Sequence, residues 1–563
     1  MPNSELAVQE ELTSRPKAGA RNLPRLERVG SHTRLIVDEK PFLCIGGELH
    51  NSSASDRAYM SPIWEKLAKA GLNSVIAPVS WEQVEPVEGR LDFSIVDELV
   101  EDARASGIRL VLIWFGAFKN ASSTYAPSWV RADRERFPRA DLGTSPMKTP
   151  FSYPGSMPRP SLSVFSHDLF EADRTAYTAL LGHVARIDPD HTVIMVQVEN
   201  EVGMLGAGRD YSALAETRWN APLPEELLTA VWEAPDSFAP EFVAVLSANS
   251  DPSMSWADQF GDDNPVAQET FMAWGFASYV GGLAAAGKQI LPLPAYTNAW
   301  LGPQQGQDKP GQYPSGGPTA KMIPVWRAAA PAIDFLAPDI YVPNSAEIMR
   351  QYASDFNPLF IPEARFRAGD AFLALGAFGG LGYNVFGVEE GREGNQFSAA
   401  CGFIRSLTPE IVDAQCDGRI FGFALDQDEA SVSAEIAGIA VTVRSARKLL
   451  EGMLLDAGVR VPPASELPGE TVAAIHGPTP GDSRPFGLVL AVNPNEFIIV
   501  GQGAQVDFHK PGADVELDSV RELVLTDAGL QDGRYLNGDE RLEILSDKHI
   551  GAVRVRLLIS ASQ

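Results

Sequence analysis

Two glutamates follow apolar segments that are predicted to be strands, and both stand where a carboxylate could do chemistry. Glu201 closes the segment VIMVQVENE, and Glu363 follows the apolar residues of PLFIPEARF. Burying a carboxylate without a partner costs free energy, so a structural role alone explains such positions poorly. Two carboxylates that flank one point are the pair that hydrolyses a glycosidic bond.

The residues around the two glutamates favour a different role for each. Side chains alternate along a strand, so one face is expected to carry Met195, Gln197, Glu199 and Glu201. Glu201 lies at the strand end and is predicted to be the acid/base, with Glu199 supporting it one pleat deeper. Arg365 is expected beside Glu363, where its charge would lower the pKa of that carboxyl and keep a nucleophile ionised.

This pairing predicts a retaining mechanism. Two carboxyl groups about 5 to 5.5 Å apart give double displacement with retention of configuration. The negative charge of Glu363 would hold the proton on Glu201. Once Glu363 carries the sugar, that charge is lost and Glu201 can act as a base.

Further polar residues at predicted strand ends are candidates for binding sugar hydroxyls. Asn200 adjoins Glu201, and Tyr341 is expected to donate a hydrogen bond to the nucleophile. The remaining candidates end or follow the first, second, third and fifth predicted strands: Glu48, Trp81, Lys119, Asn120 and Asn298.

The elements that must position these residues follow a repeating pattern. Near-continuous apolar strands alternate with amphipathic helices, which indicates parallel strands covered on both faces. Eight strands are predicted, at 42–50, 73–81, 109–118, 192–203, 290–300, 333–343, 357–365 and 383–389. They predict an α/β fold, a (β/α)8 TIM barrel, whose chemistry lies at the carboxyl ends of the strands. The fourth and seventh strands of such a barrel face each other.

The same patterns divide the chain into a tail and two domains. Residues 1–25 are predicted to be a flexible tail, and residues 26–417 the catalytic barrel, whose bottom a strand pair at 26–42 would cap. A large insertion at about 203–288 is expected to wall the active site, because loops that follow barrel strands lie over the mouth. Short strands separated by turns predict a C-terminal β-sandwich at 418–563.

Composition limits the partners of the protein. The net charge of −27 argues against nucleic acid and anionic membranes. The amino terminus lacks an apolar signal core, which predicts a cytoplasmic location. Three cysteines without a CxxC pair, and eight histidines without an HExxH motif, predict no metal, and no organic cofactor is expected either.

Three segments resemble glycoside hydrolase family 35, the β-galactosidases of a large clan of retaining barrels. They are GGELHNSS, KLAKAGLNSVIAPVSWEQVEPVEGRLDF and VQVENEVG, all within roughly residues 40–205. The resemblance implies that Asn200 holds the 2-hydroxyl, that Glu201 is the acid/base and that Glu363 is the nucleophile. It also implies that the substrate is an oligosaccharide with terminal β-galactose, including xyloglucan-type oligosaccharides of plant cell walls.

Two alternatives stay open at this point. A β-glucosidase or β-mannan hydrolase of the same clan would have the same two glutamates, because galactose differs from glucose only at O4. A carbohydrate-binding pseudoenzyme would lack one of the carboxylates, and both are present here. The sequence also leaves open whether the protein is a monomer or a homodimer.

Overall fold

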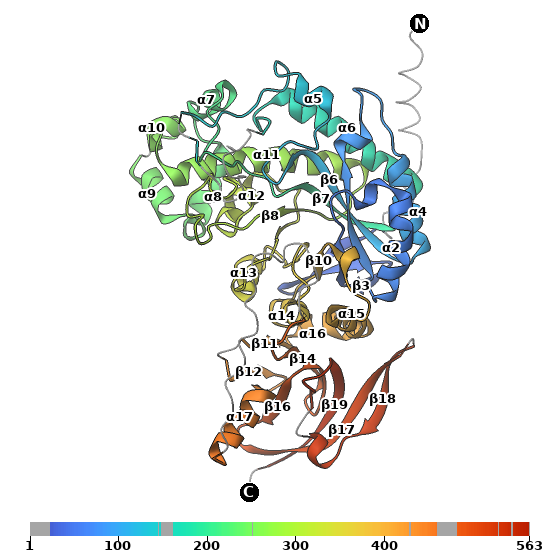
Figure 1. The fold of residues 1–563 in the computed structure, drawn as a ribbon. Helices are drawn as coiled ribbons and strands as arrows, with labels where there is room; N and C mark the ends of the chain where they lie inside the picture. The colour runs from blue at the N-terminus through green and yellow to red at the C-terminus, as the bar shows by residue number, and fades with distance from the viewer. Residues whose placement is uncertain are drawn as a thin grey trace.

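The computed structural model describes residues 23–144, 146–147, 161–249, 251–426, 429–458, 481–526, 528–541 and 544–561. Residues 1–22 of the predicted flexible tail lie outside the described residues, and the first strand begins at Arg25. Helices surround a parallel sheet in the larger part of the molecule, and antiparallel strands form the smaller part below it (Figure 1).

A parallel sheet of seven strands forms the centre of the larger part, in the order β10-β4-β5-β6-β7-β8-β9. Its strands are β4 (Cys44–Glu48), β5 (Ser74–Ser80), β6 (Arg109–Lys119), β7 (Val193–Asn200), β8 (Ala295–Ala299), β9 (Phe335–Pro338) and β10 (Gly382–Phe386). The sheet curls until only one strand position separates β9 from β10. This architecture confirms the predicted α/β barrel.

The remaining position is filled by residues 359–364, which form no regular strand although a seventh strand was expected there. Single parallel bridges join Ile340 to Ala364 on the β9 side and Ile361 to Tyr383 on the β10 side. Proline has no N–H to donate, so Pro362 interrupts any ladder through this segment. The barrel is closed, but Glu363 lies in irregular backbone.

Helices cover the outside of the sheet, as the apolar periodicity predicts. The expected helices are confirmed as α2 (Arg57–Lys69), α4 (Ser94–Ala105) and α6 (His167–Ile187). Capping residues fix where two of them begin, since the side chains of Asp56 and Ser166 accept hydrogen bonds from the N–H groups of Tyr59 and Leu169. Further helices are α3 (Trp81–Val84), α5 (Ser128–Ala132), α12 (Ile323–Ala329), α13 (Ser345–Tyr352), α14 (Ala368–Phe378), α15 (Gln396–Ser406) and α16 (Thr408–Asp417).

The amino-terminal end of the barrel is closed by a small antiparallel sheet of β1 (Arg25–Val29), β2 (His32–Val37) and β3 (Lys40–Phe42). Leu35 and Val37 pack with Cys44 and Val111, which stand near the beginnings of their strands. The expected cap is therefore present, with three strands instead of two.

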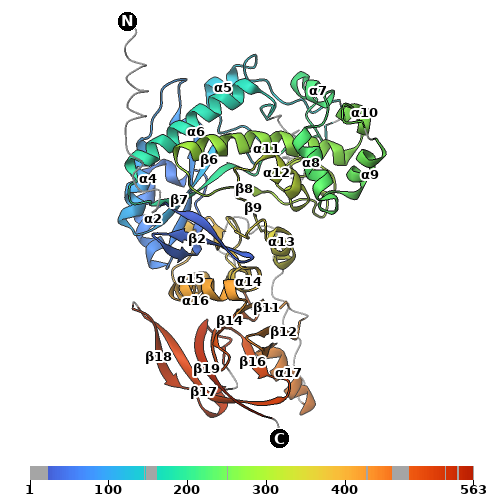
Figure 2. The same cartoon turned by 180° about the vertical axis from the view of Figure 1, so that it is seen from behind.

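The chain after β7 forms a group of short helices beside the barrel: α7 (Ala213–Trp219), α8 (Glu225–Glu233), α9 (Pro240–Ala248) and α10 (Trp256–Phe260). They lie together at one side of the molecule in Figures 1 and 2. The next helix, α11 (Pro265–Ile290), packs beside α6 and α12 and belongs to the barrel. The inserted helices thus end before residue 265, not at about 288.

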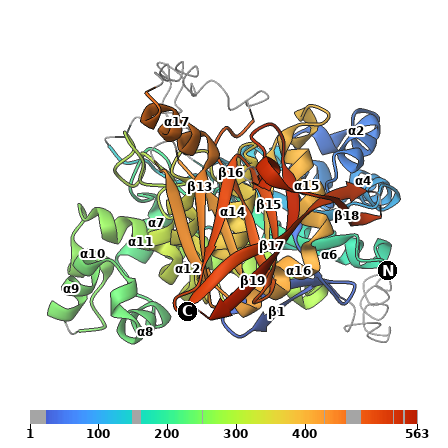
Figure 3. The ribbon, with the colours of Figure 1, turned by 90° about the horizontal axis from the view of Figure 1, so that it is seen from below.

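Two antiparallel sheets form the C-terminal part, as the predicted β-sandwich requires (Figure 3). The larger holds β11 (Ile420–Ala424), β14 (Phe486–Asn493), β15 (Glu496–Gln502), β19 (Gly551–Ala561), β17 (Ala513–Thr526) and β18 (Gly529–Tyr535). The smaller holds β12 (Ser431–Ile436), β13 (Ile439–Ser445) and β16 (Ala504–His509), and β13 leads into α17 (Ala446–Asp456). Val441, Phe497 and Val555 share the buried core of this part.

The barrel and the larger antiparallel sheet meet at α14 and β11. Gly376 of α14 faces Gly422 of β11 so closely that a Cβ atom on Gly376 would lie 2.5 Å from the Gly422 backbone. The expected division of the chain between residues 417 and 418 stays a prediction. Among the described helices, none is long and apolar enough to cross a membrane.

Candidate active site

Glu201 follows the last residue of β7 and is 7% exposed. Its φ of 45° is unusual for a residue with a side chain and costs about 1 to 3 kcal/mol. Two hydrogen bonds hold this backbone: the Glu201 N–H donates to Asn298 Oδ1 (2.9 Å), and the Ala121 N–H donates to the Glu201 carbonyl (3.1 Å). The geometry of the strand end is therefore imposed by neighbouring loops.

The environment of Glu201 favours its protonated form. Burial raises the pKa of its carboxyl to about 8, and the charge of Glu363 adds to the rise, while Lys119 and Asn120 oppose it. The Asn120 amide donates to Glu201 Oε2. A carboxyl with this pKa keeps its proton at neutral pH, which is the state that a general acid requires.

Glu363 is also buried, and the Tyr341 hydroxyl donates to its Oε1, as expected. The pKa of Glu363 is raised by burial and lowered by Lys119, by the Tyr341 hydrogen bond and by His50. The sequence predicts that Arg365 lowers the pKa of Glu363. This prediction is wrong, because the pKa is raised and the cations that oppose the rise are Lys119 and His50. Arg365 follows in irregular backbone, and desolvation of Glu363 outweighs the cations that face it.

Lys119 and Asn120 lie at the end of β6 and act on the carboxyls themselves. The Lys119 ammonium donates to Asn120 Oδ1 and lies 4.8 Å from the centre of the Phe115 ring. The side chain of Asn120 thus connects Lys119 to Glu201. The structure gives both residues protein partners that orient the acid/base, and their expected contacts with sugar hydroxyls stay a prediction.

Asn298 at the end of β8 is the centre of a hydrogen-bonded network. Its Nδ2 donates to Asn200 Oδ1 (3.2 Å) and to Asp339 Oδ2 (2.7 Å), and its Oδ1 accepts from the Glu201 backbone. Gln197 Nε2 also donates to Asn200 Oδ1 (3.0 Å). Asn298 therefore positions other residues, whereas Asn200 Nδ2 is buried with no partner among the described residues, as suits a donor to substrate.

Two further candidates, Glu48 and Trp81, differ in whether their polar atoms have partners within the protein. Glu48 is fully buried, and neither of its oxygens has a hydrogen-bond donor in the part of the chain that the structure describes. Burial and the charge of Glu363 raise its pKa well above the ordinary value. Trp81 instead packs against Trp129 in the core and donates to Glu85 Oε2 (2.9 Å), so its expected contact with substrate is not supported.

Glu199 does not share a face with Glu201, contrary to the alternation expected of the strand. Its φ of 60° turns the side chain toward β6, where it accepts hydrogen bonds from the N–H groups of Gly116, Ala117 and Phe118 at 2.9 to 3.2 Å. β6 bulges between Trp114 and Lys119. Glu199 is still a supporting residue, because it holds the bulge that brings Lys119 opposite Asn200.

Glu199 forms a carboxyl pair with Asp173 of α6. Burial raises the pKa of both groups, and the two side chains are hydrogen-bonded to each other. The Trp114 indole N–H (2.7 Å) and the Tyr279 hydroxyl (2.9 Å) donate to Asp173. Two carboxyls can bond in this way only if they share a proton.

Sequence reasoning missed Asp339, which is 3% exposed and follows β9. Burial and the charges of Glu363, Glu201 and Glu48 raise its pKa well above the ordinary value. The signal was present in PDIYVP, because Asp339 precedes Tyr341 by two residues and strand alternation puts both on one face.

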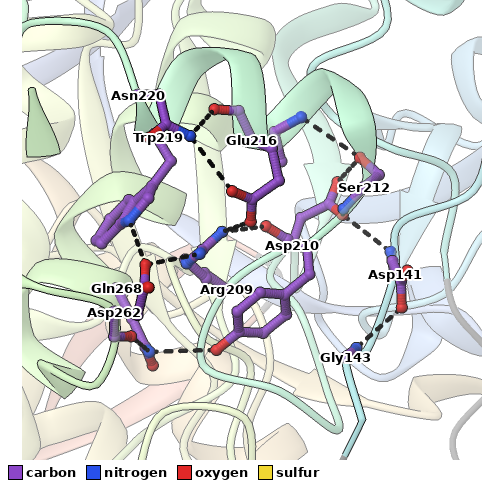
Figure 4. Close-up of polar contacts among 12 residues, drawn as sticks. Asp141, Gly143, Arg209, Asp210, Ser212, Glu216, Trp219, Asn220, Asp262 and Gln268 are labelled. Carbon is purple, nitrogen blue, oxygen red and sulfur yellow. Dashed lines mark hydrogen bonds and ion pairs between the residues drawn. The ribbon is translucent and has the colours of Figure 1, made fainter. Parts of the chain in front are cut away.

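The loops that follow β6, β7 and β8 are joined on one side of the site. Asp210 accepts hydrogen bonds from the Asp141 N–H (2.8 Å) and the Ser163 hydroxyl (2.7 Å). Arg209, which is 2% exposed, pairs with Glu216 and Asp262, and Figure 4 shows its guanidinium between their carboxylates. These contacts fasten the inserted helices to the loop after β6.

The backbone continues this connection to the loop after β8. The Met204 N–H donates to the Ser315 carbonyl (2.9 Å), and the Gly206 N–H donates to the Gly311 carbonyl (2.8 Å). Within the described ranges, no group of three His, Cys, Asp or Glu side chains could hold a metal ion. The expectation that no cofactor is needed stays a prediction.

Two family models match the sequence. The model of glycoside hydrolase family 42, described as β-galactosidase, matches residues 51–232. A domain of unknown function, DUF5597, matches residues 397–546. A β-galactosidase of Xanthomonas manihotis is 35% identical over 83 residues, which are 14% of this chain and 14% of that protein's length. The matches indicate a glycoside hydrolase, and they point to family 42 without supporting the expected family 35.

Solved structures of glycosidases align with the chain at low sequence identity and with TM-scores below 0.5. A β-galactosidase from Bacillus circulans sp. alkalophilus is 16% identical, with a TM-score of 0.45 over 67% of this chain and 58% of that one. A family 42 β-galactosidase from G. stearothermophilus is 10% identical, with a TM-score of 0.44 over 92% and 98%. A β-1,4-mannanase from Cryptopygus antarcticus is 12% identical, with a TM-score of 0.38 over 68% and 94%.

The shared proton predicts opposite outcomes for two substitutions of Glu199. In Glu199→Gln the amide N–H can replace the shared proton, the amide oxygen in the place of Oε2 can still accept from Gly116 and Phe118, and the Ala117 N–H keeps Asp173 Oδ2. The free energy of unfolding should therefore change by less than about 1 kcal/mol. In Glu199→Ala the N–H groups of Gly116 and Phe118 lose their acceptor, while the Ala117 N–H keeps Asp173 Oδ2, so the total cost should be about 2 kcal/mol or more. Urea unfolding measures both values.

The exposed Glu241 of α9 supplies the matched control, because Glu241→Gln removes a charge without touching the bulge. A Glu199→Gln variant as unstable as Glu199→Ala would contradict the shared proton.

Proposed function

We propose that the protein is a retaining exo-β-galactosidase that releases terminal non-reducing β-D-galactose from oligosaccharides. The observation that carries this proposal is the pair of buried carboxyls in contrasting environments. Glu201 has a pKa of about 8 and an amide partner, and Glu363 accepts a hydroxyl hydrogen bond from Tyr341. The first group is suited to give a proton, and the Tyr341 hydrogen bond favours the anion of the second against the effect of its burial.

In the proposed first step, a Glu363 oxygen attacks the anomeric carbon while Glu201 gives its proton to the glycosidic oxygen. The C–O bond to the leaving sugar breaks, and a galactosyl ester forms on Glu363. In the second step Glu201 takes a proton from water, the water oxygen attacks the anomeric carbon, and the ester bond breaks. Both steps invert the anomeric carbon, so the configuration is retained overall.

Two buried groups are suited to bind the sugar. The free amide hydrogens of Asn200 can donate to the 2-hydroxyl. The Glu48 carboxyl has both oxygens available and can bind two further hydroxyls, which would compensate the cost of burying it. A site that hydrogen-bonds a hydroxyl discriminates strongly against a sugar that lacks it in the same position.

Galactose is the sugar proposed because the matching family model and the Xanthomonas manihotis relative are both described as β-galactosidases. Exo action is proposed because the joined loops after β6, β7 and β8 would wall one side of the mouth. The barrel, at about 26–417, would then hold the whole site, and the β-sandwich at 418–563 would support it through α14. Xyloglucan-type oligosaccharides are the proposed natural substrates.

A panel of nitrophenyl β-glycosides tests the substrate. We expect the β-galactoside to give the highest kcat/KM, with the β-glucoside and β-mannoside reduced by about 10-fold or more, since one lost hydrogen bond to a charged group costs about 1.5 to 3 kcal/mol. Higher activity on the glucoside or mannoside would refute the galactose assignment. Activity on none would favour a carbohydrate-binding protein.

The two glutamates should differ in their response to the leaving group. Glu363→Ala removes the nucleophile, so activity should fall for every substrate. Glu201→Ala removes only proton transfer, which typically contributes about 10² to 10⁴-fold. Cleavage of a dinitrophenyl galactoside should therefore survive in a burst, followed by slow hydrolysis of the intermediate.

Azide separates the roles further, because it needs no general base. With Glu201→Ala it should restore turnover and give the β-galactosyl azide. With Glu363→Ala it should occupy the space of the missing carboxylate and give the α-galactosyl azide. If Glu201→Ala gave the α-galactosyl azide and Glu363→Ala the β-galactosyl azide, Glu363 would be the acid/base and Glu201 the nucleophile.

A further inference from the structure

Asp339 lies against Glu201 without any known part in the reaction. The two carboxyls are hydrogen-bonded to each other. Asp339 Oδ2 already accepts from Asn298 Nδ2, at 2.7 Å. Its Oδ1 is buried and has no N–H or O–H donor among the residues that the structure describes. The bond between the carboxyls therefore needs a proton on one of them.

The charges around this pair oppose its ionisation. Glu363, Glu201 and Glu48 all act on Asp339 and disfavour its negative charge. Lys119 acts on Glu48, Glu201 and Glu363, and His50 acts on Glu363 alone among these three. One ammonium cannot neutralise four buried carboxylates, and buried charges without compensation are costly. The nucleophile must be ionised, so the other carboxyls are the ones that retain protons.

We propose that Asp339 is a neutral carboxylic acid that donates a hydrogen bond to Glu201 and thereby serves as a positioning residue for the acid/base. This inference rests on the proposed role of Glu201. When Glu201 gives its proton to the leaving oxygen, the new carboxylate keeps the hydrogen bond from Asp339. The bond strengthens as charge develops, which lowers the barrier to proton transfer.

Asn298 fixes the direction of this hydrogen bond. Its two amide hydrogens go to Asn200 and Asp339, and its carbonyl oxygen accepts from the Glu201 backbone. Asn298 Nδ2 therefore presents a donor to Asp339 Oδ2, which leaves Oδ1 to carry the proton toward Glu201. One side chain thus aligns the acid/base, its neighbour Asn200 and the neutral acid.

The other titratable groups that face Asp339 are Tyr296 of β8, Tyr341 after β9 and Tyr352 of α13, since an ionised Asp339 would raise the pKa of each of them. Each is raised first by burial and stays a neutral phenol. They cannot supply a cation to ionise Asp339. The pH response of the pair is therefore governed by Glu201, Glu363, Glu48 and Lys119.

The test compares Asp339→Asn with Asp339→Ala on aryl β-galactosides. Asn keeps a donor toward Glu201 and an acceptor for Asn298, so kcat/KM should stay within about threefold of the parent value. Ala removes the donor, and kcat/KM should fall about 10- to 100-fold on phenyl galactoside but much less on dinitrophenyl galactoside. Asp334→Asn, at the other end of the barrel, serves as the control.

The pH profile separates this role from a structural one. The general acid must be protonated, so kcat/KM should fall above a pH of about 8 in the parent protein. Losing the donor raises the pKa of Glu201, so Asp339→Ala should move that fall upward by about 1 unit, while Asp339→Asn leaves it in place. If kcat/KM of Asp339→Asn instead fell at a lower pH than that of the parent protein, the substitution would have removed a negative charge beside Glu201. Asp339 would then be ionised, which would overturn the proposal. Equal losses in both variants would also overturn it.

Infrared difference spectra test the protonation state of Asp339 without an activity measurement. Parent protein minus Asp339→Asn at neutral pH should show the carbonyl band of one buried neutral carboxylic acid. A carboxylate band there instead would exclude a neutral Asp339 even if the glycoside panel failed. Conversely, an inactive parent protein with the neutral-acid band would refute the proposed function and leave the protonation of Asp339 standing.

Discussion

Four carboxyl groups are buried together at the carboxyl ends of the barrel strands, and Lys119 is the ammonium that acts on three of them. They cannot all be ionised, because each added charge raises the pKa of the others. Some of the four carboxyls, Glu48, Glu201, Asp339 and Glu363, must therefore stay protonated while others ionise. Tyr341 favours the anion on Glu363, which leaves protons on the remaining groups. The proposed acid/base and nucleophile differ in charge because of this division.

The surrounding backbone holds that arrangement under strain. Asn120, Ala121, Glu199 and Glu201 all have positive φ values near the site. Such conformations persist only where other contacts impose them. Two sets of hydrogen bonds impose these conformations here. Glu199 accepts from the N–H groups of the β6 bulge, and Asn298 accepts from the Glu201 N–H. Strain is thus concentrated where β6 and β7 end, next to the reacting groups.

Regular features of the chain were predictable because they follow from periodicity. Alternating apolar strands and helices predict the barrel, and apolar strand ends with acids identify Glu201 and Glu363 as candidates. The errors occur where backbone leaves regular geometry. Positive φ turned Glu199 away from the predicted face, and Pro362 prevented a regular seventh strand. Neither change is visible in a pattern that assumes ideal strands.

The partners of each side chain were harder to predict than its position. Arg365 is the nearest cation to Glu363 in sequence, yet Lys119 acts on that carboxyl from β6. Asn298 was predicted only to bind substrate, and its contacts with Glu201, Asn200 and Asp339 were not predicted. These contacts join residues about 40 to 250 positions apart in the sequence, so no local motif specifies them.

Labelling with 2-deoxy-2-fluoro-β-D-galactosyl fluoride tests the central claim most directly. The fluorine atom slows both steps, while the good leaving group lets the first step proceed, so the galactosyl ester accumulates. Mass spectrometry of the digested protein should find one fluorogalactosyl group per chain, on the peptide that contains Glu363. A label on Glu201 or Glu48, or no stoichiometric label while the aryl galactoside is turned over, would contradict the account.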